Sequence, residues 1–234
     1  MSLLQCAGFA VLSAEIRVPR IGAATADLTV DTETDLSGAL AITSADGAFA
    51  LQGTAYRHGQ IAQRQSIRWV AGSDGLGVTL PPAQFRGYTL RSVLTSTLTA
   101  CGERLSAASD PSLLGSFLTN WVRLGWQTGK FALLALLAAK NAQAWRVLPD
   151  GSVWVAKSEP WPAAAQTAFQ VLDVNPAEGW AIIGCEQPFI APGTMLPVDS
   201  GDGVETQRRI GYVVHTIDPT SVRAKVYFED SSPL

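Results

Sequence analysis

Charge is scarce in this chain of 234 residues. Only 16% of its residues are charged, whereas 47% are hydrophobic, and the formal net charge is −3. Such a composition provides ample apolar surface for a core, and it indicates that some of that surface is buried against other chains. Basic residues are adjacent only at Arg208-Arg209, which is too weak a positive field to hold the phosphates of nucleic acid. We therefore expect no specific nucleic-acid binding.

Residues suited to catalysis are also few. The chain has two histidines, His58 and His215, and neither stands in an H-E-x-x-H metal-binding motif. It has no G-x-S-x-G motif for a serine nucleophile. Glycines 72, 75 and 77 follow the pattern G-x-x-G-x-G, which is the wrong order for a dinucleotide-binding loop. The sequence predicts no catalytic residue, no metal site and no cofactor.

The acidic residues leave two alternatives open. Glycoside cleavage needs two carboxylates that can be distant in the sequence, and Asp173, Glu178 and Glu186 are candidates, although solvated strand edges are the simpler interpretation. Asp199 and Asp202 lie among glycines, which suggests calcium but is more typical of a flexible turn.

Cysteine is limited to Cys6, Cys101 and Cys185. The odd number and wide spacing fit neither a disulfide framework nor a metal site with paired ligands. The sequence predicts buried free thiols in a protein made in a reducing compartment.

Long hydrophobic runs are missing as well. The run over residues 131–139 holds nine apolar residues, whereas a helix that crosses a bilayer needs about 20. Residues 3–14 are mostly apolar, but no lysine or arginine precedes Arg17, so the charged start of a signal peptide is lacking. We interpret this stretch as a first strand and expect no membrane anchor.

The clearest local pattern lies at residues 128–157. Thr128 is a helix cap, and the apolar residues that follow it cover every side of a helix, which predicts a buried helix. Trp145, Val147, Val153 and Val155 then alternate about a turn at residues 148–152, which predicts a β-hairpin.

Short strands separated by turns are predicted on both sides of this unit. Residues 8–80 alternate in short runs, with a hairpin signal at Asp46-Gly47. After residue 162, strands are predicted near residues 169–174, 179–183, 207–217 and 221–228, the last two joined at Asp218-Pro219-Thr220.

Two further helices are predicted between these strands. Leu90, Val93, Leu94, Leu98 and Cys101 form a one-sided stripe that Gly102 ends. Asp110-Pro111 then starts a short helix, for which we expect Leu113, Leu114, Phe117 and Leu118 to supply the apolar residues.

Seven tryptophans are many for this length. A buried tryptophan removes 150–250 Å² from water, which is worth roughly 4–6 kcal/mol as an upper bound. We therefore expect them in the core or at subunit interfaces rather than on a sugar-stacking surface; they are Trp69, Trp121, Trp126, Trp145, Trp154, Trp161 and Trp180.

Several short motifs follow one another in a definite order along the chain. An opening strand runs into a Pro-Arg-x-Gly turn at residues 15–22, and Gly53-Thr54 and the loop at 72–76 follow. Next come the helix at 91–104 and the tryptophan hairpin at 144–155, then Pro192-Gly193-Thr194 and the final strands at 212–215 and 222–228. In this order the chain resembles the baseplate-hub or tail-tip hub proteins of tailed bacteriophages, the group that includes late-control protein D and the hub part of type VI secretion spikes.

The resemblance implies a mainly β fold with an α insertion (α+β): two small β-barrel hub domains that flank a helix–hairpin domain. We place the domains at residues 1–87, 88–162 and 163–234. It also implies a structural, non-enzymatic virion component, synthesised in the host cytoplasm. Its copies would form a homotrimer with pseudo-sixfold symmetry that links the tail tube and distal tail proteins to a central spike or tip protein. The expected subunit contacts are Trp145, Val147, Trp154, Val155, Tyr212, Val214 and Tyr227.

Two other classes of function remain as alternatives. One is a tail-associated hydrolase of the cell wall or of capsular polysaccharide, which would use the carboxylates named above. The other is a glycan-binding module, which would use exposed tryptophans.

Overall fold

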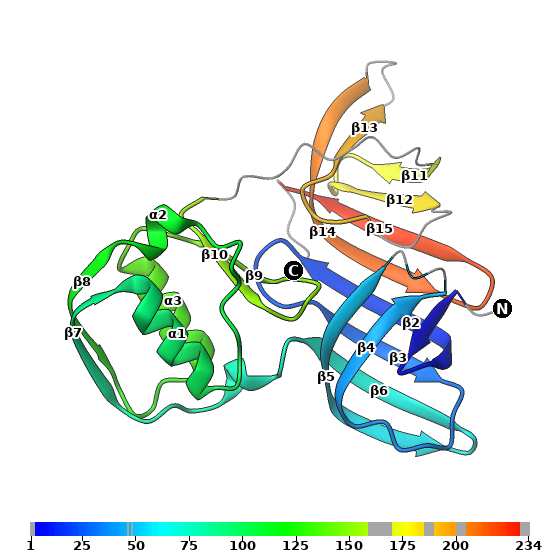
Figure 1. Cartoon of the computed structure of the whole chain (residues 1–234). Coiled ribbons are helices and arrows are strands. Elements are labelled where there is room, and N and C mark those ends of the chain that lie inside the picture. Colours follow the sequence, from blue (N-terminus) through cyan, green and yellow to red (C-terminus); the bar gives the residue numbers. More distant parts are fainter. Residues whose placement is uncertain are drawn as a thin grey trace.

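The computed structural model describes residues 3–45, 47, 49–158, 170–184, 190–199 and 205–229. The fold is mainly β, as predicted. Figure 1 shows three parts: an N-terminal barrel, a helical unit beside it, and a set of C-terminal strands above the barrel.

Six antiparallel strands form the N-terminal barrel. Their order is β1-β4-β5-β6-β3-β2, and β1 pairs with β2 to close the ring. Isoleucines and leucines from alternate positions fill the interior together with Trp69, whose indole Nε1 donates to the Leu40 carbonyl oxygen (2.9 Å). The strands are β1 Leu4–Cys6, β2 Phe9–Pro19, β3 Thr25–Val30, β4 Gly38–Ser44, β5 Ala50–Ile61 and β6 Arg64–Ala71.

The first predicted turn lies between β4 and β5. Gly47 has a φ of +71°, which glycine adopts without strain. Its amide donates to the Ser44 carbonyl oxygen (3.0 Å). Asp46, the other half of the signal, lies outside the described residues.

The C-terminal strands form a sheet with its own core. They are β11 Gln170–Asn175, β12 Trp180–Gly184, β13 Met195–Asp199, β14 Glu205–Ile217 and β15 Val222–Phe228. The Asp218 carboxylate caps the turn between β14 and β15, as it accepts from the amides of Thr220 and Ser221 (2.8 Å each). Ile183, Leu196, Ile210, Val213 and Phe228 are buried among these strands, apart from the core of the barrel.

These strands continue the sheet of the barrel. Strand β14 pairs with β2 from Ile217↔Ala14 to Tyr212↔Pro19. The resulting sheet runs β1-β4-β5-β6-β3-β2-β14-β15-β12-β11, with β13 on β14 as its eleventh strand. Of the two small barrels predicted from the sequence, the N-terminal one is closed, and it shares its sheet with the C-terminal strands. Closure of a second barrel stays a prediction.

A helical unit, residues 83–158, lies between the two sets of strands in sequence and beside the barrel in space (Figure 1). We call it the middle unit. Helix α1 buries the predicted stripe, and Gly102 beyond its end has a φ of +75°. The elements are β7 Ala83–Thr89, α1 Leu90–Ala100, α2 Pro111–Leu114, β8 Phe117–Arg123, α3 Gly129–Ala138, β9 Ala144–Val147 and β10 Val153–Ala156.

Two details of the middle unit differ from expectation. Phe117 and Leu118 begin strand β8, which pairs with β7, rather than continuing helix α2. The boundary drawn between residues 87 and 88 falls inside β7, whose hydrogen bonds all belong to the middle unit. We now propose that the division lies before Ala83.

Helix α3 begins as predicted but is not fully buried. The Thr128 hydroxyl oxygen accepts from the Phe131 amide (3.3 Å) and caps the helix. One face packs inward with Ala132, Leu133, Leu136 and Leu137, whereas the side chains of Phe131 and Leu134 are 47% and 41% exposed. The continuous apolar run therefore gives α3 two apolar faces. One packs on the core of the chain, and the other is exposed. Within the part of the chain that is described, no helix is long and apolar enough to span a bilayer.

Candidate assembly interface

The predicted hairpin β9–β10 is the joint between the barrel and the middle unit. On the barrel side, the Gly22 amide donates to the Trp145 carbonyl oxygen (3.0 Å) and the Val147 amide donates to that of Gly22 (2.9 Å). The Gln52 amide also donates to the carbonyl oxygen of Pro149 at the hairpin turn (2.8 Å). Backbone bonds of this kind fix the orientation of the two parts.

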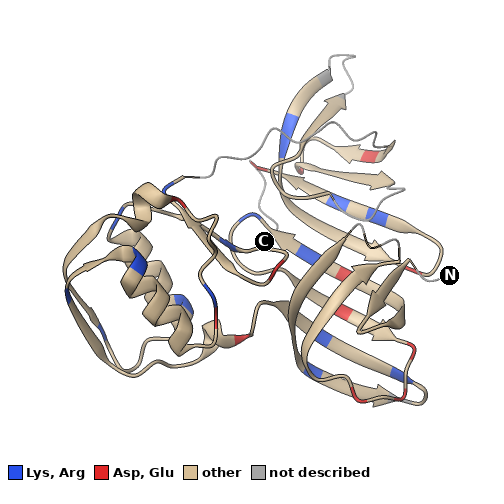
Figure 2. Ribbon diagram, viewed as in Figure 1, with Lys and Arg blue, Asp and Glu red and all other residues tan. Residues whose placement is uncertain are grey.

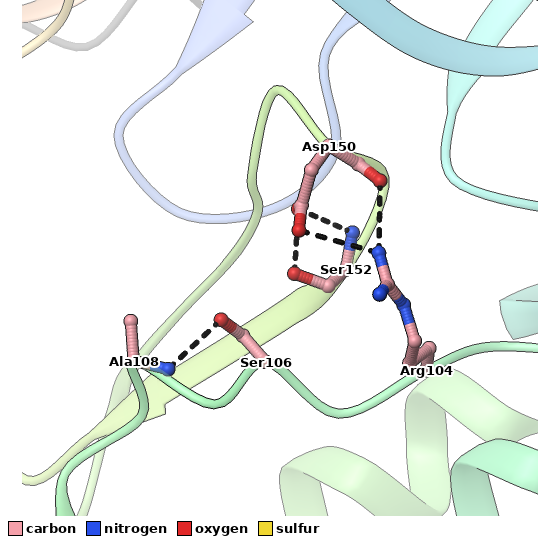
Figure 3. Close-up of polar contacts among 5 residues, drawn as sticks. All are labelled: Arg104, Ser106, Ala108, Asp150 and Ser152. Carbon is pink, nitrogen blue, oxygen red and sulfur yellow. Dashed lines mark hydrogen bonds and ion pairs between the residues drawn. The ribbon is translucent and has the colours of Figure 1, made fainter.

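On its other side the hairpin binds the segment after helix α1. The Val153 amide donates to the Arg104 carbonyl oxygen (2.7 Å), and the Ser106 amide donates to that of Val153 (2.8 Å). Figure 3 shows Asp150 at the turn, where it accepts from the Ser152 amide (2.9 Å) and from the Arg104 guanidinium (3.2 Å). The Ser106 hydroxyl accepts from the Ala108 amide in the same segment.

The four hairpin residues predicted as subunit contacts lie inside their own chain. Trp145, Val147, Trp154 and Val155 are all buried. The Trp154 indole donates to the Ala108 carbonyl oxygen (3.0 Å), and the Arg146 guanidinium covers its ring at 4.8 Å. Because the barrel and the middle unit already cover these side chains, we revise the proposed contacts between copies toward the exposed strand edges described below.

A buried carboxylate fixes the loop that leads from the barrel to the middle unit. Glu103 accepts from the Ser73 amide (3.1 Å) and from the Gly75 amide (3.0 Å), and its side chain is almost fully buried. Consecutive backbone N–H groups in a glycine-rich loop form an anion-binding concavity. This contact was not predicted from the sequence, although the Gly72-Ser73-Asp74-Gly75 loop is a signal for such an anion site.

We expect Glu103→Gln to lower the free energy of unfolding by about 1–3 kcal/mol, because it removes the negative charge that accepts from the Ser73 and Gly75 amides and places an NH2 donor against the Ser73 amide. Urea unfolding measures this loss. Glu178→Gln is the matched control, since Glu178 is exposed and bonds the indole of Trp180. Equal midpoints for the two variants would show that Glu103 does not hold the loop.

The other predicted contact residues lie together on the outer face of the shared sheet. Tyr212, Val214 and Tyr227 are half-buried, and the rings of Tyr212 and Tyr227 are 5.9 Å apart. Burial raises the pKa of the Tyr212 hydroxyl. The Lys225 ammonium lies over the ring of Trp180 at 4.4 Å, which leaves that ring face unavailable for stacking on a sugar. The contact of Tyr212, Val214 and Tyr227 with a neighbouring copy stays a prediction.

Ion pairs continue this face across β2, β3 and β6. Arg17 bonds Glu15 and Asp27 (2.5 and 2.8 Å), and Arg68 bonds Asp27 (3.1 Å). The hydrogen bond from Arg17 to Asp27 raises the pKa of the guanidinium. Figure 2 shows blue and red residues mixed along these strands. The face is therefore polar and balanced in charge, and it is not a basic surface for nucleic acid.

Several strand edges of the sheet are open within the described residues, among them part of β5, strand β11, and strand β13, which pairs with β14 alone. Strand β5 pairs with β4 only over residues 50–55, so that residues 56–61 have β6 on one side and no strand on the other. At the far end, β11 pairs with β12 alone. The edge strand β11 exposes the apolar side chains of Val171 and Leu172.

The histidines and cysteines occupy structural positions. His58 pairs with Asp35 (2.9 Å). The Nε2 of buried His215 donates to the Ile190 carbonyl oxygen (3.1 Å), and burial lowers its pKa to about 4. Burial raises the pKa of the Cys6 thiol to about 11 and also raises that of Cys101. Both are buried free thiols, as predicted; Cys185 lies outside the described residues.

The structure describes some of the carboxylates named for the two alternatives. Asp173 is exposed and bonds the Val174 amide, and Glu178 is exposed beside Trp180. Glu186 and Asp202 lie outside the described residues, and Asp199 ends strand β13. Among the described residues, no group of three or more His, Cys, Asp or Glu side chains could hold a metal ion.

A hollow near the joint between the barrel and the middle unit includes a carboxylate that already has backbone partners. A cavity of about 320 Å³ beside the barrel includes Asp74, Glu103 and Lys130 in its lining. Since the Glu103 carboxylate is already bonded to two backbone amides, it is not placed to act as a general acid.

The tryptophans divide between core and surface. Trp69, Trp145 and Trp154 are buried, as expected, and Trp121 is partly buried against the core. Trp126 differs, because its side chain is 62% exposed. Trp161 lies outside the described residues.

Several solved structures have a fold similar to that of this chain. No family model and no curated protein sequence matches the chain. A 43 kDa tail protein of prophage MuSo2 from Shewanella oneidensis has a TM-score of 0.63 at 12% identity, over 96% of this chain and 95% of that one. A tail protein from Neisseria meningitidis MC58 has a TM-score of 0.65 at 13% identity, over 97% and 95%.

A third neighbour belongs to a secretion machine. It is an Escherichia coli component of the type VI secretion system with structural similarity to the T4 bacteriophage tail proteins gp27 and gp5. Its TM-score is 0.67 at 11% identity, over 98% of this chain and 78% of that one. These likenesses confirm the predicted resemblance at the level of the fold: the chain has the β-barrel fold of phage tail proteins and type VI spike-like proteins.

Proposed function

We propose that this chain is a structural, non-enzymatic component of a phage tail or a related injection device. In this proposal it forms a homotrimeric hub that links the tail tube to a central spike or tip protein. The fold supports it, because it is shared over nearly the whole of two phage tail proteins.

The observation that carries the proposal is the continuous sheet through both sets of strands. Eight strands follow one another in the order β5-β6-β3-β2-β14-β15-β12-β11. Because β2 and β14 are hydrogen-bonded, the barrel and the C-terminal strands of one copy present a single curved wall rather than two loosely joined domains. Three such walls would complete a ring with six similar units.

The open edges supply the contact between copies. Residues 56–61 of β5 and strand β11 lie at opposite ends of the wall and differ in sequence. A contact between two different edges is heterologous, and repetition of it closes a ring when the rotation allows. Pairing also removes unpaired strand edges, which would otherwise cause aggregation.

The test of the hub is the mass of the assembled protein. Sedimentation equilibrium at micromolar concentration is expected to give three times the chain mass of 24.8 kDa. Electron microscopy should show a ring with three copies. A monomer at these concentrations, also in the presence of a tail-tube protein, would contradict the proposal.

We expect Leu172→Lys to weaken the trimer at least tenfold, because the substitution places a charge on an apolar edge that a neighbour would bury. Val78→Lys is the matched control: both side chains are 50% exposed, but Val78 lies on neither edge. Sedimentation of the two variants decides the matter. If both variants formed the trimer as strongly as wild type does, β11 would be excluded as the contact.

A further inference from the structure

Helix α3 has an apolar face that its own chain leaves exposed. Phe131, Leu134, Ala135 and Ala138 stand at i, i+3, i+4 and i+7, opposite the residues that pack into the core. Residues with this spacing lie on one side of a helix and form the surface by which one helix packs on another. Helix α1 of the same unit differs, because Arg91, Ser92, Thr95 and Thr99 occupy its exposed side. Of these two helices, α3 is therefore the one with an apolar outer face.

Exposed aromatic residues lie near both ends of this apolar face. The ring of Trp126 contacts that of Phe131, with centroids 5.1 Å apart. At the other end Lys140 donates to the carbonyl oxygen of Phe117, whose side chain is 69% exposed. Exposed aromatic residues beside a helix seam are the kind of anchor that dominates protein interfaces. We call Trp126, Phe131, Leu134, Ala135 and Ala138 the α3 seam.

Charge around the α3 seam defines its partner further. Lys130 lies in the first turn of α3, and Lys140 follows its end. The middle unit, residues 83–158, holds eight Lys and Arg against three Asp and Glu, a net charge of +5. The rest of the chain holds nine against seventeen, a net charge of −8. Figure 2 shows blue residues predominating on the helical unit.

We propose that the α3 seam binds an acidic amphipathic helix of a partner protein. Apolar residues of that helix at i, i+3 and i+4 would pack on Phe131 and Leu134, and the small Ala135 and Ala138 allow close approach of the two backbones. Carboxylates at its margins would meet Lys130 and Lys140. A second α3 is disfavoured as the occupant, since lysines would then face lysines. The proposal does not depend on the ring.

The test uses a synthetic probe and the whole chain. The probe is a labelled amphipathic peptide of about 20 residues, long enough to be helical, with a leucine seam flanked by glutamates; its twin carries lysines instead. Fluorescence anisotropy measures binding at 0.15 M salt. The glutamate peptide is expected to bind, and the double variant Phe131→Ser, Leu134→Ser is expected to weaken it at least tenfold.

Two charge variants separate contact from general attraction. Lys130→Glu is expected to weaken the glutamate peptide several-fold and to strengthen the lysine peptide. Arg91→Glu makes the same charge change on the polar face of α1, where screening beyond about 8 Å should leave binding nearly unchanged. All substituted side chains are exposed, so thermal unfolding should confirm that each variant is folded.

Three results would overturn the proposal. The first is a glutamate peptide that fails to bind, or that binds wild type and the serine double variant equally. The second is binding to phosphatidylglycerol vesicles through Phe131 and Leu134 without peptide binding, which would assign the seam to a membrane. The third is self-association that the double variant abolishes, which would assign it to a second copy.

Discussion

Replacing Gly75 with alanine is expected to lower the free energy of unfolding by about 3 kcal/mol or more. A Cβ atom at this position would lie 1.5 Å from the carbonyl oxygen of Cys101 and 2.7 Å from its carbonyl carbon. Both obstacles are backbone atoms just beyond helix α1, so no side-chain rotation relieves the clash. The backbone would have to shift to relieve the clash, and this shift would pull the Gly75 amide away from the Glu103 carboxylate. Urea unfolding followed by circular dichroism measures the loss.

Gly77→Ala provides the control for this clash. Gly77 belongs to the same short 3-10 helix, Gly75–Gly77, and a Cβ there meets nothing within 4 Å. We expect a change within about 0.5 kcal/mol. If both alanines had similar effects, the close approach between the loop and Cys101 would not be a source of stability.

The second large effect is expected inside the barrel, at Gly53. A Cβ on this residue would lie 2.2 Å from a ring carbon of Trp69 and 2.2 Å from the Val70 carbonyl oxygen. Trp69 is fully buried and bonded to Leu40, so the ring has no space into which it can move. Gly53→Ala should therefore destabilise the protein by about 3 kcal/mol or more, with a change in tryptophan fluorescence.

Gly59→Ala is the matched control in the same strand β5. A Cβ at Gly59 has no neighbour within 4 Å, and replacing a strand glycine by alanine reduces the entropy of the unfolded chain. We expect equal or slightly higher stability than wild type. Loss of the barrel in both variants would point to the backbone of β5 rather than to the packing of Trp69.

Local signals in the sequence were sufficient for most helix ends and strands. Thr128 and Asp110 cap helices because their side-chain oxygens reach amides of the first turn. Gly102 follows α1 with a positive φ, and the stripe of α1 faces the core. These features depend on residues within a few positions of one another, which is the range that a sequence pattern describes.

Contacts between distant segments could not be predicted in this way. The pairing of β2 with β14 joins segments at opposite ends of the chain, and neither strand carries a mark of its partner. Strand β7 was missed because Gly87, with a φ of +68°, interrupts its alternation. The sequence also does not indicate whether an apolar side chain is buried by its own chain or by a neighbouring copy. This is why the hairpin tryptophans were assigned to an interface, and why the exposed face of α3 was expected to be buried.

The same limit applies to the candidate interface. Tyr212, Val214 and Tyr227 could be placed on one face because they alternate along two strands that a short turn joins. The contact of Glu103 with the loop at residues 73–75 needed the fold, since about 30 positions separate its partners.

The shared edge of β2 has a consequence for the order of folding. Phe9 and Ala10 pair with β1 and close the barrel, whereas residues 14–19 of the same edge await β14, which is made roughly 200 residues later. At ribosomal rates that interval lasts roughly 10–40 s. We expect the nascent barrel to stand with this edge uncovered meanwhile. Glu15, Arg17 and Pro19, on that stretch, are the residue types that discourage a wrong strand from adding to it.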